Sequence, residues 1–481
     1  MNLSAPPQPL QDAFAWLAAE PDGDPLRELV PMRRHLQAVA GAEIPEAQRR
    51  VCLRAFRPRL ARTDAAVAPL LLDVMLPLPL RIRNVARAMG EIHDLATRCL
   101  HGVSQDPTIT TTSRNALRDD AMQVLTHTHR QQMIALLTLA PPPAELWDYA
   151  LAAFRRAGGL DNPDAHDRLG HMLALMAAQP EGLTPRELNF LAEVLRPFGH
   201  GVTLQAEPPA EGEEWLWINP QTGQPPMAGS RLPAPDGQPV LYFNCQRLAE
   251  QIGTYVDFLA HGTPPEALKL PREAALPDYL NVLRRAVGHW RNPRRRQFVR
   301  RGQTSRGQVC VRLGELWRML QGGSVDPGSV SDWMVLNESP SGLAMMHLGG
   351  DIGGLIAGSA VGFRPGLNDP WSICLVRWAR SDNPAHIELG VELIAPTATA
   401  VRLVPTAAGA EPIPALLLPP IQRLGLPEAL LLARTTEAFK EFTLLTEQGG
   451  QLRLSACAVG EPRHQTSSVE VFDFRRITQP E

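Results

Sequence analysis

Hydrophobic positions in the first 198 residues recur at helical spacing. One example is an apolar series at every third or fourth position: Ile82, Val85, Met89, Ile92, Ala96 and Cys99. Another helix is expected after Thr184, which can cap it, with Pro185 at its first position and Glu187 completing a capping box. No fixed repeat length is present, so the pattern does not favour a solenoid. We predict an all-α helical domain over residues 1–198.

Residues 199–293 have a different pattern, with prolines crowded around the apolar run Trp215–Ile218. Short strands separated by proline turns fit this stretch, and Val240–Phe243 is expected to be a further strand. Helices are predicted at about 245–259 and 278–290, and Pro293 disfavours helix at the residue before it. The stretch is therefore predicted to be a proline-rich α/β connector domain.

From about residue 308 the pattern is that of β-strands. Apolar or β-branched runs alternate with Gly, Pro, Asn and Asp turns at 309–313, 332–336, 342–348, 372–379, 387–394, 415–418, 429–433, 441–446, 451–459 and 468–474. Gly449-Gly450 between two runs is a hairpin signal. We expect one or two small antiparallel barrels, divided into a β-barrel at 294–400 and a β unit at 401–481. The predicted fold class is α+β multidomain.

Composition narrows the function. The 481 residues carry 47 Lys+Arg against 50 Asp+Glu, so no global field attracts nucleic acid or an anionic membrane. The most apolar stretch, 66–80, contains Asp73 and three prolines and is shorter than a spanning helix needs. The N-terminus lacks a basic run and an apolar segment, so no export signal is expected. Six scattered cysteines predict reduced thiols in a cytoplasmic protein.

One segment departs strongly from this charge balance. Residues 279–314 contain no acidic residue and no lysine but ten arginines, namely Arg284, Arg285, Arg291, Arg294, Arg295, Arg296, Arg300, Arg301, Arg306 and Arg312. The planar guanidinium matches phosphate oxygens and the O6/N7 edge of guanine, and it stacks on ring faces. The segment therefore indicates a nucleotide-like anion. A solvated basic linker, or a patch that docks on an acidic partner, explains the same charges.

A second feature is Asn337-Glu338-Ser339-Pro340-Ser341-Gly342, between two predicted strands. Asn and Ser form turns and can hydrogen-bond a ligand, and Gly permits unusual backbone geometry. Such a string also arises by chance in an ordinary polar hairpin, so it decides nothing by itself.

Together and in this order, the two features resemble the PilZ domain of bacterial cyclic di-GMP receptors. That family carries RRxxxR or RxxxR before its first strand, matched here by Arg295–Arg300, and D/NxSxxG at a strand turn, matched by Asn337–Gly342. Residues 371–378 resemble the penultimate strand of the family, and 389–393 resemble its closing strand. The resemblance covers about residues 294–396.

The resemblance implies a binding site for cyclic di-GMP and a role for each matched residue. Arg296 and Arg300 would grip phosphate and guanine edges, and Arg295 would stack on the ligand or neutralise it. Asn337 and Ser339 would hydrogen-bond guanine or phosphate, and Gly342 would let the backbone turn beneath the base. Because the arm precedes the barrel, ligand could order it and reorient the helical part. The processes commonly controlled by this messenger are motility, pili, biofilm and exopolysaccharide.

Catalytic patterns are weak. His127-Thr128-His129 and His166 with His171 lack the spacing of a zinc site, so exposed or capping histidines are the prediction. Gly349–Gly354 fits neither GxGxxG nor the P-loop pattern, and is predicted to be a β-loop. Four tryptophans are expected to fill cores rather than stack on bases: Trp215, Trp217, Trp371 and Trp378. We predict no enzyme, no metal and no cofactor.

The predicted function is a cytoplasmic cyclic di-GMP receptor that transmits the signal to an unidentified protein partner, with no nucleic acid and no membrane span. The main alternative is a nucleotide-independent interaction scaffold with a degenerate PilZ-like barrel. A third possibility, a nucleic-acid arm, is disfavoured because the arginine segment lacks lysines and interleaved aromatics. Substitution of Arg296 or Arg300 distinguishes the first two.

Overall fold

Two units make up the chain in its computed structural model. Unit 1 contains residues 1–74, 78–180 and 185–296, and unit 2 contains 75–77, 181–184 and 297–481. The structure describes residues 7–101, 111–210, 214–219, 224–238, 240–293, 301–323, 327–383, 386–406, 410–422, 425–435, 439–448 and 451–477. The four-domain division expected from the sequence is finer than this and stays a prediction.

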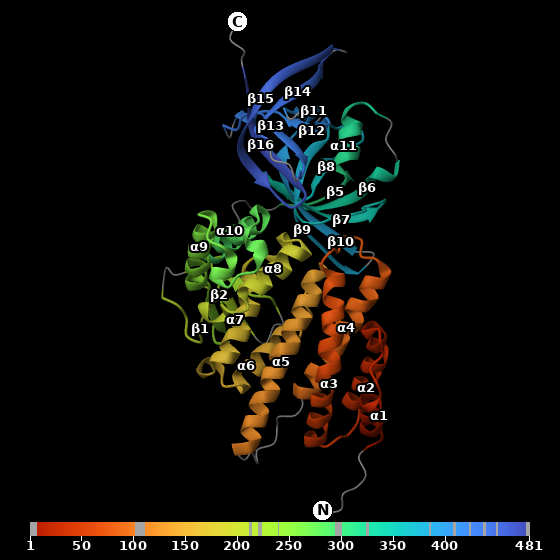
Figure 1. Cartoon of the computed structure of the whole chain (residues 1–481), viewed down its shortest axis with the longest axis vertical. Coiled ribbons are helices and arrows are strands. Elements are labelled where there is room, and N and C mark those ends of the chain that lie inside the picture. Colours follow the sequence, from red (N-terminus) through yellow and green to blue (C-terminus); the bar gives the residue numbers. More distant parts are fainter. Residues whose placement is uncertain are drawn as a thin grey trace, which may run out of the picture. The chain divides into compact units, whose positions relative to one another are not determined.

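Unit 1 is mainly helical, as predicted (Figure 1). Its first eight α-helices are α1 (Gln8–Ala18), α2 (Leu29–Gly41), α3 (Glu46–Val67), α4 (Leu80–His101), α5 (Thr111–Leu137), α6 (Leu146–Arg156), α7 (Pro163–Ala177) and α8 (Pro185–Leu195). Helix α4 buries Met89, Ile92, Ala96 and Cys99, so the predicted apolar face is the face that packs on α2 and α5. Both expected helices are therefore confirmed.

The proline-rich part of unit 1 forms a small antiparallel sheet followed by two helices. The strands are β1 (Thr203–Gln205), β2 (Leu216–Ile218), β3 (Met227–Ala228) and β4 (Leu241–Asn244), in the order β1-β4-β2-β3. Helices α9 (Gln246–Ala260) and α10 (Pro277–Arg291) pack on each other. Helix α10 ends two residues before Pro293, as the steric effect of proline on its preceding residue predicts.

Unit 2 begins with a closed six-stranded antiparallel barrel, which we call barrel 1. Its strands are β5 (Arg301–Cys310), β6 (Val330–Ser339), β7 (Gly342–Gly349), β8 (Ala360–Arg364), β9 (Ser372–Asn383) and β10 (His386–Ala395). The short helix α11 (Leu313–Leu320) lies between β5 and β6 in the chain. The core includes an inward row of four residues on neighbouring strands, all at most 2 % exposed: Val335, Met345, Leu389 and Ala379.

A second closed barrel follows, which we call barrel 2. Its strands are β11 (Thr399–Pro405), β12 (Ile413–Leu418), β13 (Ala429–Ala433), β14 (Glu441–Gln448), β15 (Gln451–Gln465) and β16 (Val469–Arg476). When the strands of each barrel are numbered one to six along the chain, both barrels close in the order 1-2-3-6-5-4. Barrel 2 therefore has the strand order of barrel 1, and its own core is centred on Phe442, Leu430 and Phe472.

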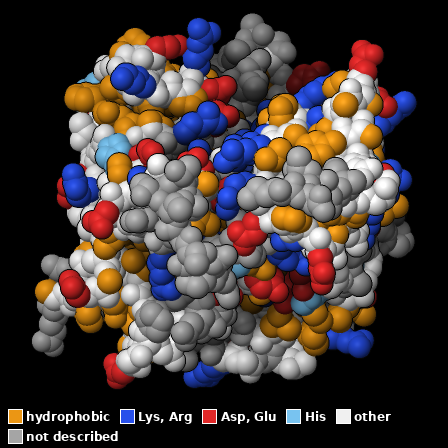
Figure 2. Space-filling view, turned by 90° about the horizontal axis from the view of Figure 1, so that it is seen from below, with side chains coloured by type: hydrophobic (Ala, Val, Ile, Leu, Met, Phe, Trp, Pro, Cys, Tyr) orange, Lys and Arg blue, Asp and Glu red, His pale blue; other side chains and the backbone are white. Residues whose placement is uncertain are grey.

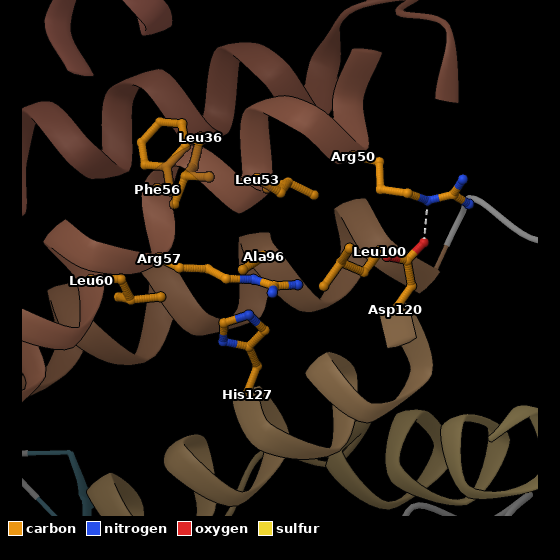
Figure 3. A pocket seen from close by; sticks show the side chains of 10 residues that line it. All are labelled: Leu36, Arg50, Leu53, Phe56, Arg57, Leu60, Ala96, Leu100, Asp120 and His127. Carbon is orange, nitrogen blue, oxygen red and sulfur yellow. Dashed lines mark hydrogen bonds and ion pairs between the residues drawn. The ribbon is translucent and has the colours of Figure 1, made fainter. Parts of the chain in front are cut away.

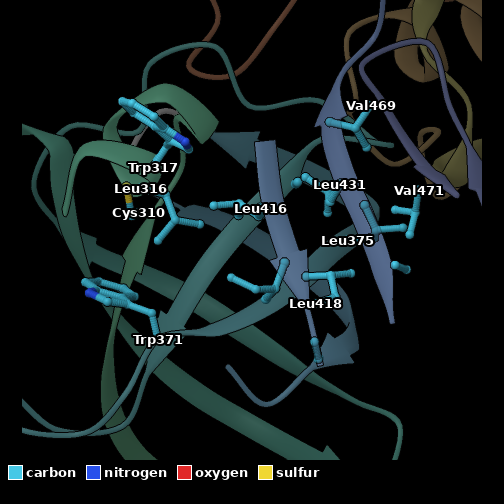
Figure 4. Packing of buried hydrophobic residues seen from close by; sticks show 14 residues of the cluster. Cys310, Leu316, Trp317, Trp371, Leu375, Leu416, Leu418, Leu431, Val469 and Val471 are labelled. Carbon is cyan, nitrogen blue, oxygen red and sulfur yellow. The ribbon is translucent and has the colours of Figure 1, made fainter. Parts of the chain in front are cut away.

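The two barrels share a second hydrophobic cluster (Figure 4). Barrel 1 contributes Ile373 and Leu375 from β9, and α11 contributes Leu316 and Trp317. Barrel 2 contributes apolar side chains from the opposite face to its own core, namely Leu416, Leu418, Ala429, Leu431, Val469 and Val471. Strand β13 is thus buried on both faces, which explains its uninterrupted sequence Ala-Leu-Leu-Leu-Ala.

Every expected strand overlaps an observed one, but the strand expected at 309–313 was largely wrong, because β5 ends at Cys310 and α11 begins at Leu313. Two strands, β8 and β11, were missed. Strand β8 is only five residues long, and its glycine interrupts the β-branched pattern. Strand β11 alternates buried Val401, Leu403 and Pro405 with more exposed residues. The glycine-rich segment after β7 contains no strand, as predicted.

Candidate functional site

The β6–β7 hairpin carries the Asn-x-Ser-x-x-Gly residues. Ser339 ends β6, Gly342 begins β7, and the two residues pair across the hairpin. The Ser339 hydroxyl donates a hydrogen bond to the Gly342 carbonyl at 3.2 Å and lies 3.4 Å from the Ser341 hydroxyl. Ser339 therefore closes the turn and keeps its oxygen lone pairs available as acceptors.

A β-bulge decides where Asn337 points. Val335 faces the core and is 2 % exposed, and strict alternation would turn Asn337 inward as well. The pairing of β6 with β7 shifts between Val335 and Asn337, which leaves Leu336 as the extra residue. Asn337 then pairs with Ala344, and the bulge turns its side chain onto the outer face, a common use of bulges beside functional sites.

Asn337 belongs to a row of residues that crosses the outer face of barrel 1. Going across β5, β6, β7, β10 and β9, the paired residues are Gly302, Asn337, Ala344, Gly390 and Trp378, which we call the outer row of barrel 1. The residues between Asn337 and Trp378 are small, and both Ala344 and Gly390 are buried. The Asn337 Oδ1 atom is buried and has no hydrogen-bond partner among the described residues.

The position of Trp378 corrects the prediction that it fills a core. A Cβ atom on Gly390 would lie 1.9 Å from the Trp378 indole nitrogen, so the indole lies flat over this glycine on the outer face. The Arg380 guanidinium lies 5.6 Å from the ring centroid. Glycine at 390 is what allows the half-buried ring to rest on the sheet. Trp215, Trp217 and Trp371 are buried, as predicted.

Gly342 has a structural role that does not depend on any ligand. A Cβ atom at this position would lie 2.1 Å from the Val391 carbonyl oxygen of β10. Next to it, the Leu393 amide donates a hydrogen bond to the Ser341 carbonyl at 3.0 Å. The last glycine of the motif therefore allows β10 to approach the hairpin closely.

The charges on the outer face lie mainly at the two ends of a neighbouring row, Arg306, Met334, Met346, Glu388 and Arg380. Arg380 donates from Nε to Glu388 at 2.7 Å, and His386 lies 2.9 Å from the same carboxylate. At the other end, Arg306 is exposed and makes no ion pair with the described residues. Among the described residues of this row, Arg306 at the β5 end is therefore available to meet an anion.

The arginine motif itself lies outside the described residues, since Arg295, Arg296 and Arg300 fall in the gap at 294–300. Strand β5 begins directly after this gap. Its first residues Arg301 and Gly302 pair with Glu338 and Asn337, so β5 starts beside the Asn-x-Ser turn.

In unit 1, a cavity between α2, α3, α4 and α5 holds about one water molecule and is too small for a nucleotide (Figure 3). Arg50 pairs with Asp120 at one end, and the Arg57 side chain lies beside His127. Burial, with His93 and Arg57 nearby, lowers the pKa of His127 to about 3. Burial raises the pKa of the Cys52 and Cys99 thiols to about 11, so neither is poised as a nucleophile.

The prediction of exposed or capping histidines was wrong for His127 and His171, which are both buried. Helix α5 packs against both α4 and α7, so buried His127 and half-buried His129 lie on its two sides. His127 Nδ1 lies 3.0 Å from His93 Nδ1, and His93 Nε2 lies 3.0 Å from an Asp64 oxygen. The ring centroids of His129 and His171 are 4.6 Å apart. His166 is half-buried.

Within the described part of the chain, no group of three or more His, Cys, Asp and Glu residues is placed to hold a metal ion. The same part of the chain contains no helix with both the length and the hydrophobicity of a membrane span. On the face shown in Figure 2, basic and acidic side chains are interspersed rather than gathered by sign.

Comparison with known families agrees with this geometry. The model for the N-terminal domain of the cyclic-di-GMP receptor FimW matches residues 11–210, and the model for the middle PilZ domain of the same receptor matches 323–400. The second match includes β6–β10 and begins after the arginine arm and β5. Neither the curated proteins nor the solved structures gave a match. The two models together cover more than half of the residues, and the chain belongs to the PilZ-domain family of cyclic di-GMP receptors.

Proposed function

We propose that this chain binds cyclic di-GMP on the outer face of barrel 1 and transmits the bound state to a protein partner. The observation that carries the proposal is Asn337, which a bulge turns outward and whose buried amide oxygen has no hydrogen-bond partner in the described part of the chain. A buried acceptor without a partner costs about 1–3 kcal/mol, and the N–H groups of a guanine edge would remove that cost. Its neighbours in the outer row, Ala344 and Gly390, carry no polar side chain that would occupy this acceptor.

The charges of the segment support an anionic ligand. Arg295, Arg296 and Arg300 stand directly before β5, whose first residues pair with the Asn-x-Ser turn. Guanidinium groups can bind both phosphate oxygens and the O6/N7 edge of guanine. Exposed Arg306 adds a further cation on the same face. Trp378, at the far end of the outer row, offers a ring face on which the second base could stack.

The test is isothermal titration of the full chain with cyclic di-GMP, with GTP and cyclic AMP as controls. We expect saturable binding that Arg296→Ala and Arg300→Ala abolish, since two charge-assisted contacts are lost. Arg453→Ala removes the same charge from an exposed position in barrel 2 and should bind like the unmodified chain. Absence of binding, or equal loss in Arg453→Ala, would leave the scaffold function as the better account.

Transmission to a partner is tested separately, by hydrogen–deuterium exchange of the helical unit with and without cyclic di-GMP. We expect a ligand-dependent change within residues 11–210, the part that matches the N-terminal domain of the receptor family. The same change should be absent in Arg296→Ala. Exchange that changes only in barrel 1 would contradict transmission through the helical unit.

A further inference from the structure

Barrel 2 repeats the strand order of barrel 1, but its outer face is chemically different. In barrel 1 the outer row across strands two, three and six is Asn337, Ala344 and Gly390. The corresponding outward row in barrel 2 is Leu416, Leu431 and Val471, and each of these residues is fully buried. The row in barrel 1 therefore has one polar residue and two small ones, whereas the row in barrel 2 has three large apolar residues.

The segments that would complete a nucleotide site are also different in barrel 2. Three residues, Pro396-Thr397-Ala398, separate β10 from β11, so no arginine arm precedes its first strand. The connection between β12 and β13, residues 419–428, contains no Asn, Asp or Ser. Neither half of the motif is present in barrel 2.

Barrel 1 and helix α11 cover this apolar face. The Trp317 indole N–H donates to the Val401 carbonyl at 2.7 Å, and the Arg402 guanidinium lies 5.1 Å from the Trp317 ring centroid. On another side, the Thr466 hydroxyl donates to the Gly358 carbonyl at 2.8 Å. Helix α11 is the segment inserted between β5 and β6, the strands that carry the candidate site in barrel 1. The insertion therefore contributes to holding barrel 2.

We propose that barrel 2 is a second barrel of PilZ type that has exchanged nucleotide binding for docking. The face of strands two, three and six, which carries the candidate site in barrel 1, is the docking face in barrel 2. Its partner is barrel 1 of the same chain, through α11, β8 and β9. The chain consequently has one barrel able to bind a nucleotide. That barrel is held through α11, β8 and the first residues of β9, Ile373 and Leu375, whereas its outer row reaches β9 at Trp378.

The docking is tested by hydrogen–deuterium exchange of the full chain, without any nucleotide. Leu431→Asp places a charge in the shared cluster, and Leu454→Asp is the matched control, because Leu454 is in the same barrel but 66 % exposed. We expect amide exchange in α11 and β8 to rise at least about tenfold in Leu431→Asp and to stay unchanged in the control. Equal exchange in α11 and β8 for the two variants would overturn the proposal.

A milder variant keeps the test valid if Leu431→Asp does not fold. Trp317→Phe removes only the indole donor to Val401 and leaves an aromatic ring in the cluster. We expect exchange in α11 to rise about threefold, the lower end for one lost hydrogen bond. An unchanged rate in α11 would contradict docking through this helix.

The loss of nucleotide binding is tested by titrating the variant Arg296→Ala/Arg300→Ala/Asn337→Ala with cyclic di-GMP. We expect no saturable binding, because the only site is in barrel 1. Residual binding that is lost on substitution in barrel 2 would overturn this part of the proposal. If the unmodified chain does not bind either, the proposed function fails, and the exchange experiment still decides the docking.

Discussion

Barrels 1 and 2 have the same strand order, but the side chains on their outer faces differ in size and polarity. Where barrel 1 has Asn337, Ala344 and Gly390, barrel 2 has Leu416, Leu431 and Val471. The first row is suited to a flat polar ligand, and the second packs against protein. The inward rows of both barrels are apolar, so the difference between the barrels lies in their outward rows. Strand order alone therefore does not assign a function to either barrel.

The largest effect is expected from shortening one outward side chain on the third strand of each barrel. Leu431→Ala in β13 should lower the free energy of unfolding by about 2–5 kcal/mol, because Leu431 is fully buried between the barrels. Met346→Ala in β7 should cost less than about 1 kcal/mol, since Met346 is only half-buried. Urea unfolding measures the free energy of unfolding of both variants. Equal losses would contradict the difference between the two outer faces.

Gly342→Ala tests how tightly the hairpin of barrel 1 is tied to its sixth strand. The new Cβ would lie 2.1 Å from the Val391 carbonyl oxygen, so we expect a loss of about 1–3 kcal/mol in the free energy of unfolding. Gly349→Ala, at the other end of β7, is the control because a Cβ there meets no atom within 4 Å. Thermal unfolding that is the same for both variants would contradict the close approach.

Trp378→Ala tests whether the far end of the outer row takes part in binding. Loss of one stacked base should weaken cyclic di-GMP binding by at least about fivefold, and Trp378→Phe should recover part of it. Ligand should quench indole fluorescence in the unmodified chain, and this quenching should be absent in both variants. Binding by Trp378→Ala at full affinity would confine the site to the Asn337 end.

Asn337→Ala should separate binding from stability. We expect about tenfold weaker binding of cyclic di-GMP, because a hydrogen bond in the site is lost. The melting temperature without ligand should not fall, since the removed oxygen has no partner among the described residues. A large drop in melting temperature would show that Asn337 holds the barrel together.

A separate effect, outside both barrels, concerns the helical unit at acid pH. Burial lowers the pKa of His127 to about 3 and of His171 to about 4, so the folded unit holds both rings neutral while the unfolded chain binds protons below about pH 6.5. The contribution of these two neutral rings to the stability of the folded unit is complete above that pH and is lost as the pH falls towards 4. His171→Gln should reduce the loss of stability of the helical unit between pH 7 and 5. Hydrogen–deuterium exchange of the α7 amides measures this loss. An unchanged fall would contradict this role.

Much of the fold could be predicted from the sequence, because the signals were local. Helical spacing in α4, the proline after α10 and the apolar runs of β13 and β9 each correspond to an observed element. The reason for the continuous apolar runs could not be predicted. They come from a second buried face, and that face exists only when two barrels pack together.

Only part of the candidate site could be predicted from the sequence. The Asn-x-Ser-x-x-Gly string marked the hairpin, but the outward direction of Asn337 depends on a bulge that alternation does not predict. Trp378 was predicted to fill a core because an apolar residue in a strand usually faces inward. Its outward position depends on Gly390, twelve residues further along the chain. The buried histidines were missed because one helix packs on two neighbours.

The most direct test of the account is hydrogen–deuterium exchange of the full chain with and without cyclic di-GMP, compared between the two barrels. We predict protection in peptides that contain residues 301–306 and 335–344, and no change in peptides of β12 and β13. Protection in β12 and β13, or in neither barrel, would contradict the assignment of the nucleotide to the outer face of barrel 1.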